Sequence, residues 1–194
     1  MENKKKGMST KTMVLGAVLT ALVVILQLIG RYTAFFGPFS TALPLIPIVI
    51  GAATCGVGIG TLLGLVFGVL VLFTNSELFL AFSIPGTVIT VLFKGMACGF
   101  AAGVTYKFLK KLNNTVAVIA SAVICPIVNT SVFLLGCALF FVGNADAIAA
   151  KLSIDASGMS VFYALASANF LLELGMNIVL SPSVIRVLKI REKL

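Results

Sequence analysis

Apolar runs long enough to cross a bilayer recur along nearly the whole chain, separated by short segments that hold most of the charges. Of the 194 residues, 60% are apolar and 10% are charged, whereas soluble domains are typically about half apolar and about a quarter charged. This pattern excludes a soluble enzyme domain, a disordered chain and a disulfide-stapled secreted chain. It predicts an all-α integral membrane protein that forms a single membrane domain over residues 1–194.

The apolar runs divide into six expected transmembrane helices, at about 13–29, 41–55, 57–73, 86–109, 116–142 and 161–188. The first run follows a lysine-rich start, but no small-x-small cleavage site comes after it. We therefore expect an uncleaved span there rather than a signal peptide. The second span is short and holds Pro44 and Pro47 in its outer half. Six spans place both termini on the same side of the membrane.

Basic residues gather on the side of the two termini. With six spans, 11 of the 14 basic residues fall there: Lys4, Lys5, Lys6, Lys11, Lys107, Lys110, Lys111, Arg186, Lys189, Arg191 and Lys193. The loops of the opposite side carry only Arg31 and Lys151. The positive-inside rule then predicts cytoplasmic termini in a multi-pass protein of the cell membrane, here expected to be a bacterial plasma membrane. The net charge of +8 reflects this topology, and no nucleic-acid partner is expected.

The sequence lacks the groups that common enzyme mechanisms need. It has no histidine, which excludes HExxH zinc sites and Ser-His catalysis, and it has no GxxxxGK[ST] motif for nucleotide phosphates. The four cysteines are interpreted as packing residues because they lie in apolar segments and form no CxxC pair: Cys55, Cys98, Cys125 and Cys137. We therefore expect no catalytic residue, no metal site and no cofactor.

Small residues at four-residue spacing indicate close helix packing. Glycines 60, 64 and 68 form such a ridge in the third span, and glycines 95, 99 and 103 form another in the fourth. Ridges of this kind let helix backbones approach in lipid, so we interpret both as internal packing faces. Ala17 and Ala21 form a similar face in the first span, near its cytoplasmic end. For this face, internal packing and contact with a partner protein both remain open.

Two ionisable residues lie inside predicted spans, where charge is costly and usually marks a function. Lys94 is expected ~12 Å from the outer end of the fourth span, and Glu173 ~20 Å from the outer end of the sixth, at 1.5 Å per residue. Asn169 lies one turn from Glu173, and the fifth span places Asn129 and Thr130 at a similar depth. Three helices thus bring polar groups to the outer half of the membrane.

Three interpretations of this polar set remain open. The favoured one is a pocket that binds a small polar substrate through Lys94, Asn129, Thr130, Asn169 and Glu173. The second is an ion pair between Lys94 and Glu173 that only holds the bundle together. The third is an ion path, as in an autonomous proton- or ion-coupled carrier with Glu173 as its coupling site. Carriers commonly have an inverted repeat, and none is detected in this sequence.

Several of these features together resemble a known family. They are the basic start, the Ala17-Val-Leu-Thr-Ala21 face, the short second span with its prolines, the Gly60-Thr-Leu-Leu-Gly64-Leu-Val-Phe-Gly68 run, and Pro-Ile-Val-Asn-Thr at 126–130. With six spans in about 190 residues, the chain resembles the substrate-binding S component of energy-coupling factor (ECF) vitamin importers over nearly its whole length.

This resemblance implies a role in transport rather than catalysis. An S component captures a water-soluble vitamin or vitamin precursor at the outer surface, and a transmembrane coupling subunit with two ATPase subunits drives its delivery inward. The resemblance implies that Ala17 and Ala21 dock on the coupling subunit. Which vitamin is bound stays open: Lys94 suits a carboxylate and so slightly favours pantothenate, folate or biotin, while riboflavin and a pyrimidine precursor remain possible.

Overall fold

The computed structural model describes residues 10–33 and 43–192, and within these ranges every secondary-structure element is a helix and no strand is present. The prediction of an all-α protein is therefore confirmed. In chain order the elements are α1 (Thr10–Thr33), α2 (Leu45–Cys55), α3 (Val57–Thr74), α4 (Glu77–Leu80), α5 (Ile84–Leu109), α6 (Asn114–Phe140), the 3-10 turn η2 (Val142–Asn144), α7 (Ala145–Leu152) and α8 (Met159–Glu192).

Five helices are long and apolar enough to cross a membrane, namely α1, α3, α5, α6 and α8. The predicted spans match these five to within a few residues at each end. The sixth, α2, is apolar but has only 11 residues, about half the length that a bilayer core needs at 1.5 Å per residue. We predicted its start near residue 41, which lies outside the described residues, whereas α2 begins at Leu45.

Local sequence signals explain where the longer helices begin. The side chain of Ser83 accepts a hydrogen bond from the backbone N–H of Gly86 (3.2 Å), and Pro85 follows in the first turn of α5, where a proline needs no donor. Asn113 caps α6 in the same way by accepting from the N–H of Thr115 (2.8 Å). In α2, Pro44 and Pro47 also fall at or before the first turn, which a proline tolerates.

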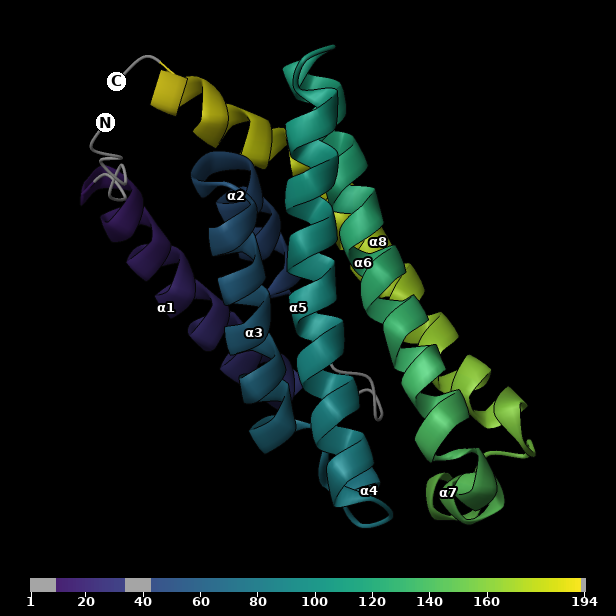
Figure 1. The fold of residues 1–194 in the computed structure, drawn as a ribbon. Helices are drawn as coiled ribbons and strands as arrows, with labels where there is room; N and C mark the ends of the chain where they lie inside the picture. Colours follow the sequence, from purple (N-terminus) through teal and green to yellow (C-terminus); the bar gives the residue numbers. More distant parts are fainter. Residues whose placement is uncertain (1–9, 34–42, 193–194) are drawn as a thin grey trace, which may run out of the picture.

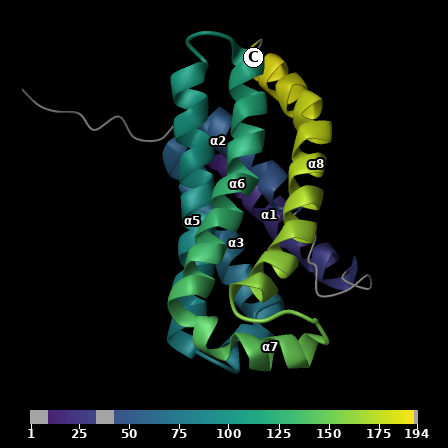
Figure 2. The same ribbon diagram turned by 90° about the vertical axis from the view of Figure 1, so that its right-hand side faces the viewer.

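The short helix α2 lies in the interior of the bundle. Most of its residues are buried, and Leu45, Ile48 and Val49 belong to the same core cluster as Leu63 and Phe67 of α3. A helix that is apolar on all sides is expected to be surrounded by other helices. Figure 2 shows α2 behind α5 and α6, and this position accounts for a helix that need not span the bilayer by itself.

The two glycine ridges pack against each other. A Cβ atom added to Gly64 would overlap the backbone carbonyl of Gly95, and one added to Gly95 would overlap that of Gly64. One turn away, a Cβ on Gly99 would overlap the carbonyl of Gly60, while a Cβ on Gly60 would overlap Ala52 of α2 and lie 3.0 Å from the carbonyl oxygen of Gly99. α3 and α5 therefore cross with their backbones in contact, and the prediction of internal packing is confirmed for both ridges.

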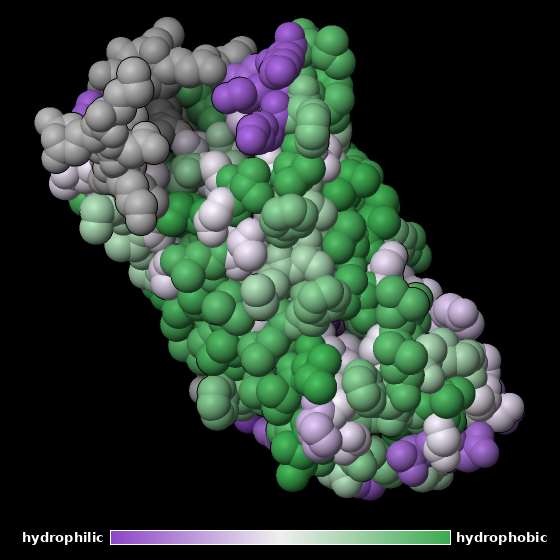
Figure 3. Space-filling model, viewed as in Figure 1, coloured by the Kyte–Doolittle hydropathy of each residue, from purple (hydrophilic) through white to green (hydrophobic). Residues whose placement is uncertain are grey.

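Different helices and turns lie at the two ends of the bundle. Figure 1 shows the start of α1, the turn between α5 and α6 and the end of α8 at one end, with α4 and α7 at the other. Figure 2 places α6 between α5 and α8, and in Figure 1 α8 runs behind α6. Figure 3 shows a mostly apolar middle, with hydrophilic residues mainly near the ends. This distribution is the one that a bilayer-spanning bundle requires.

Candidate functional site

A cavity of about 280 Å³ lies toward the α4 and α7 end of the bundle, within walls supplied by α3 to α8. All five residues that we predicted to bind substrate line it: Lys94 from α5, Asn129 and Thr130 from α6, and Asn169 and Glu173 from α8. The structure thus brings the predicted set together in one place. That these side chains bind a ligand stays a prediction.

The ammonium group of Lys94 lies over an aromatic ring of the cavity. The Nζ atom lies 5.4 Å from the centre of the Phe133 ring, which gives a cation–π contact. Among the described residues, no side chain or carbonyl forms a hydrogen bond or an ion pair with this ammonium. An ammonium has three N–H donors, so the group can still bind an acceptor placed in the cavity.

Glu173 is held by amide groups rather than by Lys94. Its carboxylate Oε2 accepts a hydrogen bond from Asn129 Nδ2 at 3.2 Å, and the side chain is 5% exposed. One turn along α8, Asn177 donates to the Glu173 backbone carbonyl at 2.8 Å. The ion pair between Lys94 and Glu173, our second interpretation of the polar set, is not formed: in the described part of the chain the one ion pair joins Arg31 to Glu77.

Two asparagine carbonyls beside Glu173 lack a partner. Asn129 Oδ1 and Asn169 Oδ1 are buried, and no described group donates to either of them. The orientation of Asn129 follows from its neighbour, because a carboxylate only accepts hydrogen bonds and so draws the amide NH₂ toward itself. Buried polar atoms are normally paired, so these two oxygens indicate a place where an N–H or O–H donor belongs.

Apolar side chains complete the walls. Phe79 of α4 packs edge-on against Phe133 of α6, with ring centres 5.7 Å apart, and both rings line the cavity. Val91 and Leu165 add aliphatic surface from α5 and α8. The cavity therefore has a polar floor and aromatic and aliphatic sides, which is the usual make-up of a small-molecule site.

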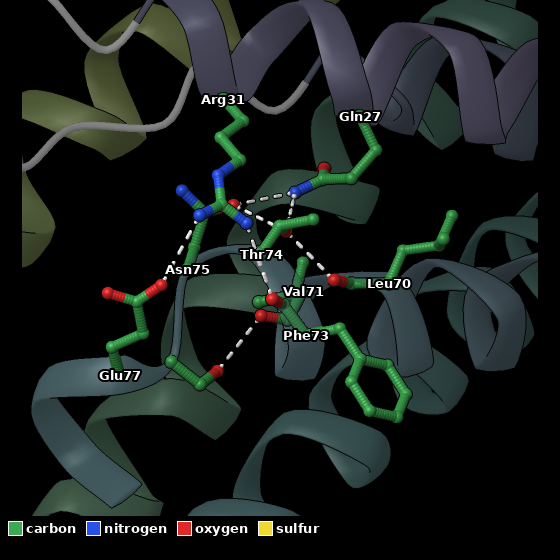
Figure 4. A network of polar contacts seen from close by, with 9 residues as sticks. Gln27, Arg31, Leu70, Val71, Phe73, Thr74, Asn75 and Glu77 are labelled. Atoms are coloured by element: carbon green, nitrogen blue, oxygen red, sulfur yellow. Dashed lines mark hydrogen bonds and ion pairs between the residues drawn. The ribbon is translucent and has the colours of Figure 1, made fainter. Parts of the chain in front are cut away.

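The corner between α3 and α4 also lines the cavity, through four consecutive polar residues that the sequence analysis did not single out: Thr74, Asn75, Ser76 and Glu77. α1 holds this corner (Figure 4). Gln27 Nε2 donates to Thr74 Oγ1 and to Asn75 Oδ1, both at 2.9 Å, and Arg31 contacts Glu77 Oε1 at 3.3 Å. Gln27, an amide inside an apolar run, is the sequence feature that could have indicated this contact.

The Ala17 and Ala21 face points away from the bundle. Both alanines are exposed, and they lie beside Val14 and Val18, which are each 59% exposed. Gly16, on another side of α1, instead packs on Ile59 of α3. Internal packing is therefore wrong for Ala17 and Ala21, and contact with lipid or a partner protein remains.

Comparison with known proteins gives one family. A family model described as "ECF transporter, substrate-specific component" matches residues 11–185 of the chain. No curated protein matches it. The matched range includes every residue that lines the cavity.

Proposed function

Since this chain belongs to the substrate-specific components of ECF transporters, we propose that it captures a small water-soluble vitamin or vitamin precursor outside the cell and passes it inward with an ATP-driven module. One observation carries the proposal. The cavity gathers, from three helices, a carboxylate together with an ammonium and two amide carbonyls that have no hydrogen-bond partner among the described residues, beside apolar side chains. Polar groups left unpaired at such a depth are costly unless a ligand completes them.

The direction of capture is proposed from charge. Lys107, Lys110 and Lys111 lie at the end of α5 and just beyond it, at the same end of the bundle as the start of α1. The positive-inside rule favours the cytoplasm for this end, and with it both termini. The cavity at the α4 and α7 end would then face outward, in a protein of the cell membrane, expected to be a bacterial plasma membrane.

The exposed alanine face is proposed as the docking site for the module. Substrate-specific components of ECF transporters work with an ECF module, and we propose a transmembrane coupling subunit and two ATPase subunits as the partners. Ala17 and Ala21 place two small side chains on the exposed side of α1, beside the larger Val14 and Val18, and small residues at this spacing allow a partner helix to approach closely. No catalytic residue and no cofactor is assigned to the chain itself.

Native mass spectrometry of the purified protein tests the proposal. We expect a stoichiometric small molecule that solvent extraction identifies, and added vitamin from the same class should rebind to the emptied protein. The protein alone in vesicles should transport little of it. An empty protein that ignores a panel of vitamins would contradict the proposal. Uptake by the protein alone, driven by a proton gradient and lost in Glu173→Gln, would favour the autonomous carrier instead.

A further inference from the structure

The polar groups of the cavity need two kinds of hydrogen-bond partner, donors for three oxygens and an acceptor for one ammonium. Asn129 Oδ1 and Asn169 Oδ1 are buried acceptors without donors, and Glu173 Oε1 accepts no hydrogen bond from the described residues. These three oxygens come from α6 and α8. On α5, the Lys94 ammonium is a donor that finds no acceptor in the described part of the chain. Because Lys94 and Glu173 do not pair, a ligand must satisfy the two groups separately.

We propose that the cavity selects a ligand with two unlike polar ends, a refinement that rests on the proposed function. One end carries two or more N–H or O–H donors and binds Asn129, Asn169 and Glu173. The other end is an anion, such as a carboxylate, and binds Lys94. A charged acceptor is favoured there because a hydrogen bond between an ammonium and a carboxylate is stronger than one to a neutral oxygen.

Apolar side chains also contact the ligand. Phe133 presents aromatic surface to Lys94 and Phe79 packs on Phe133, while Val91 and Leu165 present aliphatic surface. These four side chains cannot hydrogen-bond, so the part of the ligand that contacts them is apolar or a flat ring. A molecule that is polar along its whole length would leave some of its polar groups unpaired against them.

Matched pairs of compounds test the charge at the Lys94 end. The probes are pantothenate against panthenol, biotin against biotinamide, and riboflavin as a neutral compound with several donors. Affinity is measured by calorimetry on the full-length chain in nanodiscs, after extraction and identification of any co-purifying molecule. We expect the acid of at least one pair to bind at least about tenfold more tightly than its neutral analogue. Lys94→Gln should remove that difference.

A second lysine of the same helix provides the control. Lys107 is exposed in the last turn of α5, outside the cavity, so Lys107→Gln removes the same charge and should keep the preference for the acid. Equal affinity of the wild type for the acid and its neutral analogue in every pair would overturn this inference and leave the transport role standing. So would a co-purifying molecule without an anionic group. Absence of any bound or extracted molecule would overturn the transport role as well.

The polar contacts of α1 carry a second, independent inference. Gln27 is 2% exposed, and its amide spans from α1 to the corner between α3 and α4, where Thr74 and Asn75 line the cavity. Arg31, one turn further along, contacts the Phe73 carbonyl at 3.4 Å and the Glu77 carboxylate at 3.3 Å. Figure 4 shows both side chains reaching from α1 to this corner.

We infer that Gln27 and Arg31 are positioning residues that keep the α3–α4 corner closed over the cavity. α4 has only four residues and none of them is fully buried, and its aromatic contacts, Phe79 with Phe133 and Phe141, do not involve α1. The hydrogen bonds to α1 add to these contacts in holding the corner in place. Loss of the Gln27 amide should let the corner open more often without unfolding the bundle.

A thiol in the cavity measures this opening without any ligand. Ala166 lines the cavity and is 6% exposed, so the reporter substitution Ala166→Cys is slow to react with a charged methanethiosulfonate reagent while the corner is closed. The chain without the reporter gives the background from its native cysteines. Gln27→Leu should raise the reporter's reaction rate about tenfold, which corresponds to about 1.4 kcal/mol lost from the closed state. Arg31→Gln should raise it less.

Thr20 supplies the matched control on the same helix. Its hydroxyl donates at 2.8 Å to the carbonyl of Gly16 within α1 itself, so Thr20→Val removes a hydrogen bond that does not reach α3 or α4. Its reporter rate should stay that of the wild type. Equal rates in all backgrounds, or an equal rise with Thr20→Val, would overturn the inference.

Discussion

Two identical substitutions on α3 should have different effects, because only one of them falls on the glycine contact. A Cβ on Gly64 would overlap the carbonyl oxygen of Gly95, whereas a Cβ on Gly58 would meet nothing within 4 Å. Gly64→Ala therefore forces α3 and α5 apart, and Gly58→Ala does not. The obstacle is backbone, so no side-chain rotation can relieve it.

The size of the difference follows from this geometry. Adding a methyl group to a tightly packed interior costs about 1–3 kcal/mol, and a rigid backbone obstacle places Gly64→Ala near the upper value. Replacing glycine by alanine in a helix returns up to about 1 kcal/mol in propensity, equally at both positions. The free energy of unfolding of Gly64→Ala should thus lie about 2–3 kcal/mol below that of Gly58→Ala.

Reversible unfolding in mixed micelles, with increasing sodium dodecyl sulfate in a mild detergent and circular dichroism as the signal, measures this difference. Gly58→Ala should stay within about 1 kcal/mol of the wild type. If the two variants have equal free energies of unfolding, the backbone contact between Gly64 and Gly95 does not hold the bundle together, and the reasoning from the two ridges is refuted.

Three further predictions concern the partner face, the cavity floor and an outer turn. Ala17→Phe or Ala21→Phe should impair vitamin uptake in cells at least about tenfold, which corresponds to a loss of about 1.4 kcal/mol in docking free energy. The purified variant should still bind its vitamin normally. Lost vitamin binding with intact assembly would contradict this prediction. Asn129→Leu removes the hydrogen-bond donor to the buried Glu173 carboxylate and should lower the free energy of unfolding by about 1–3 kcal/mol in the same micelle assay. An unchanged free energy of unfolding would contradict this prediction. Gly158 has φ of +56°, so Gly158→Ala should cost about 1–2 kcal/mol there, whereas Gly143→Ala, with open space around it, should be neutral.

Sequence periodicity predicted the packing of the fold well, because lipid leaves few other ways to hold helices together. Glycines at four-residue spacing must face another backbone closely, and the two ridges do face each other. The sequence could not choose between a lipid-facing and an inward-facing Ala17, since alanine suits both positions. That choice depends on which side of α1 meets α3, and the buried Gly16 and Gln27 decide it.

The sequence predicted five of the residues that line the candidate site, but not which of them interact with each other. Depth along each helix was enough to bring Lys94 and Glu173 to one cavity. Depth says nothing about the rotation of a helix about its axis, so it could not distinguish an ion pair from an ammonium that lies over Phe133. The α3–α4 corner was missed because its residues are ordinary loop residues until α1 holds them against the cavity.

The glycine contact also accounts for the direction of Lys94. Successive residues of a helix are about 100° apart, so the rotation of α5 that presses Gly95 against α3 turns Lys94 about 100° away from it. On that side lies α6, which itself approaches α5 closely, since a Cβ on Gly136 would overlap the Thr90 side chain. The ammonium is thereby placed over Phe133 rather than beside Glu173. The α3–α5 glycine contact and ligand recognition by Lys94 are therefore coupled. Gly64→Ala, although it lies outside the cavity, should weaken ligand binding, whereas Gly58→Ala should not.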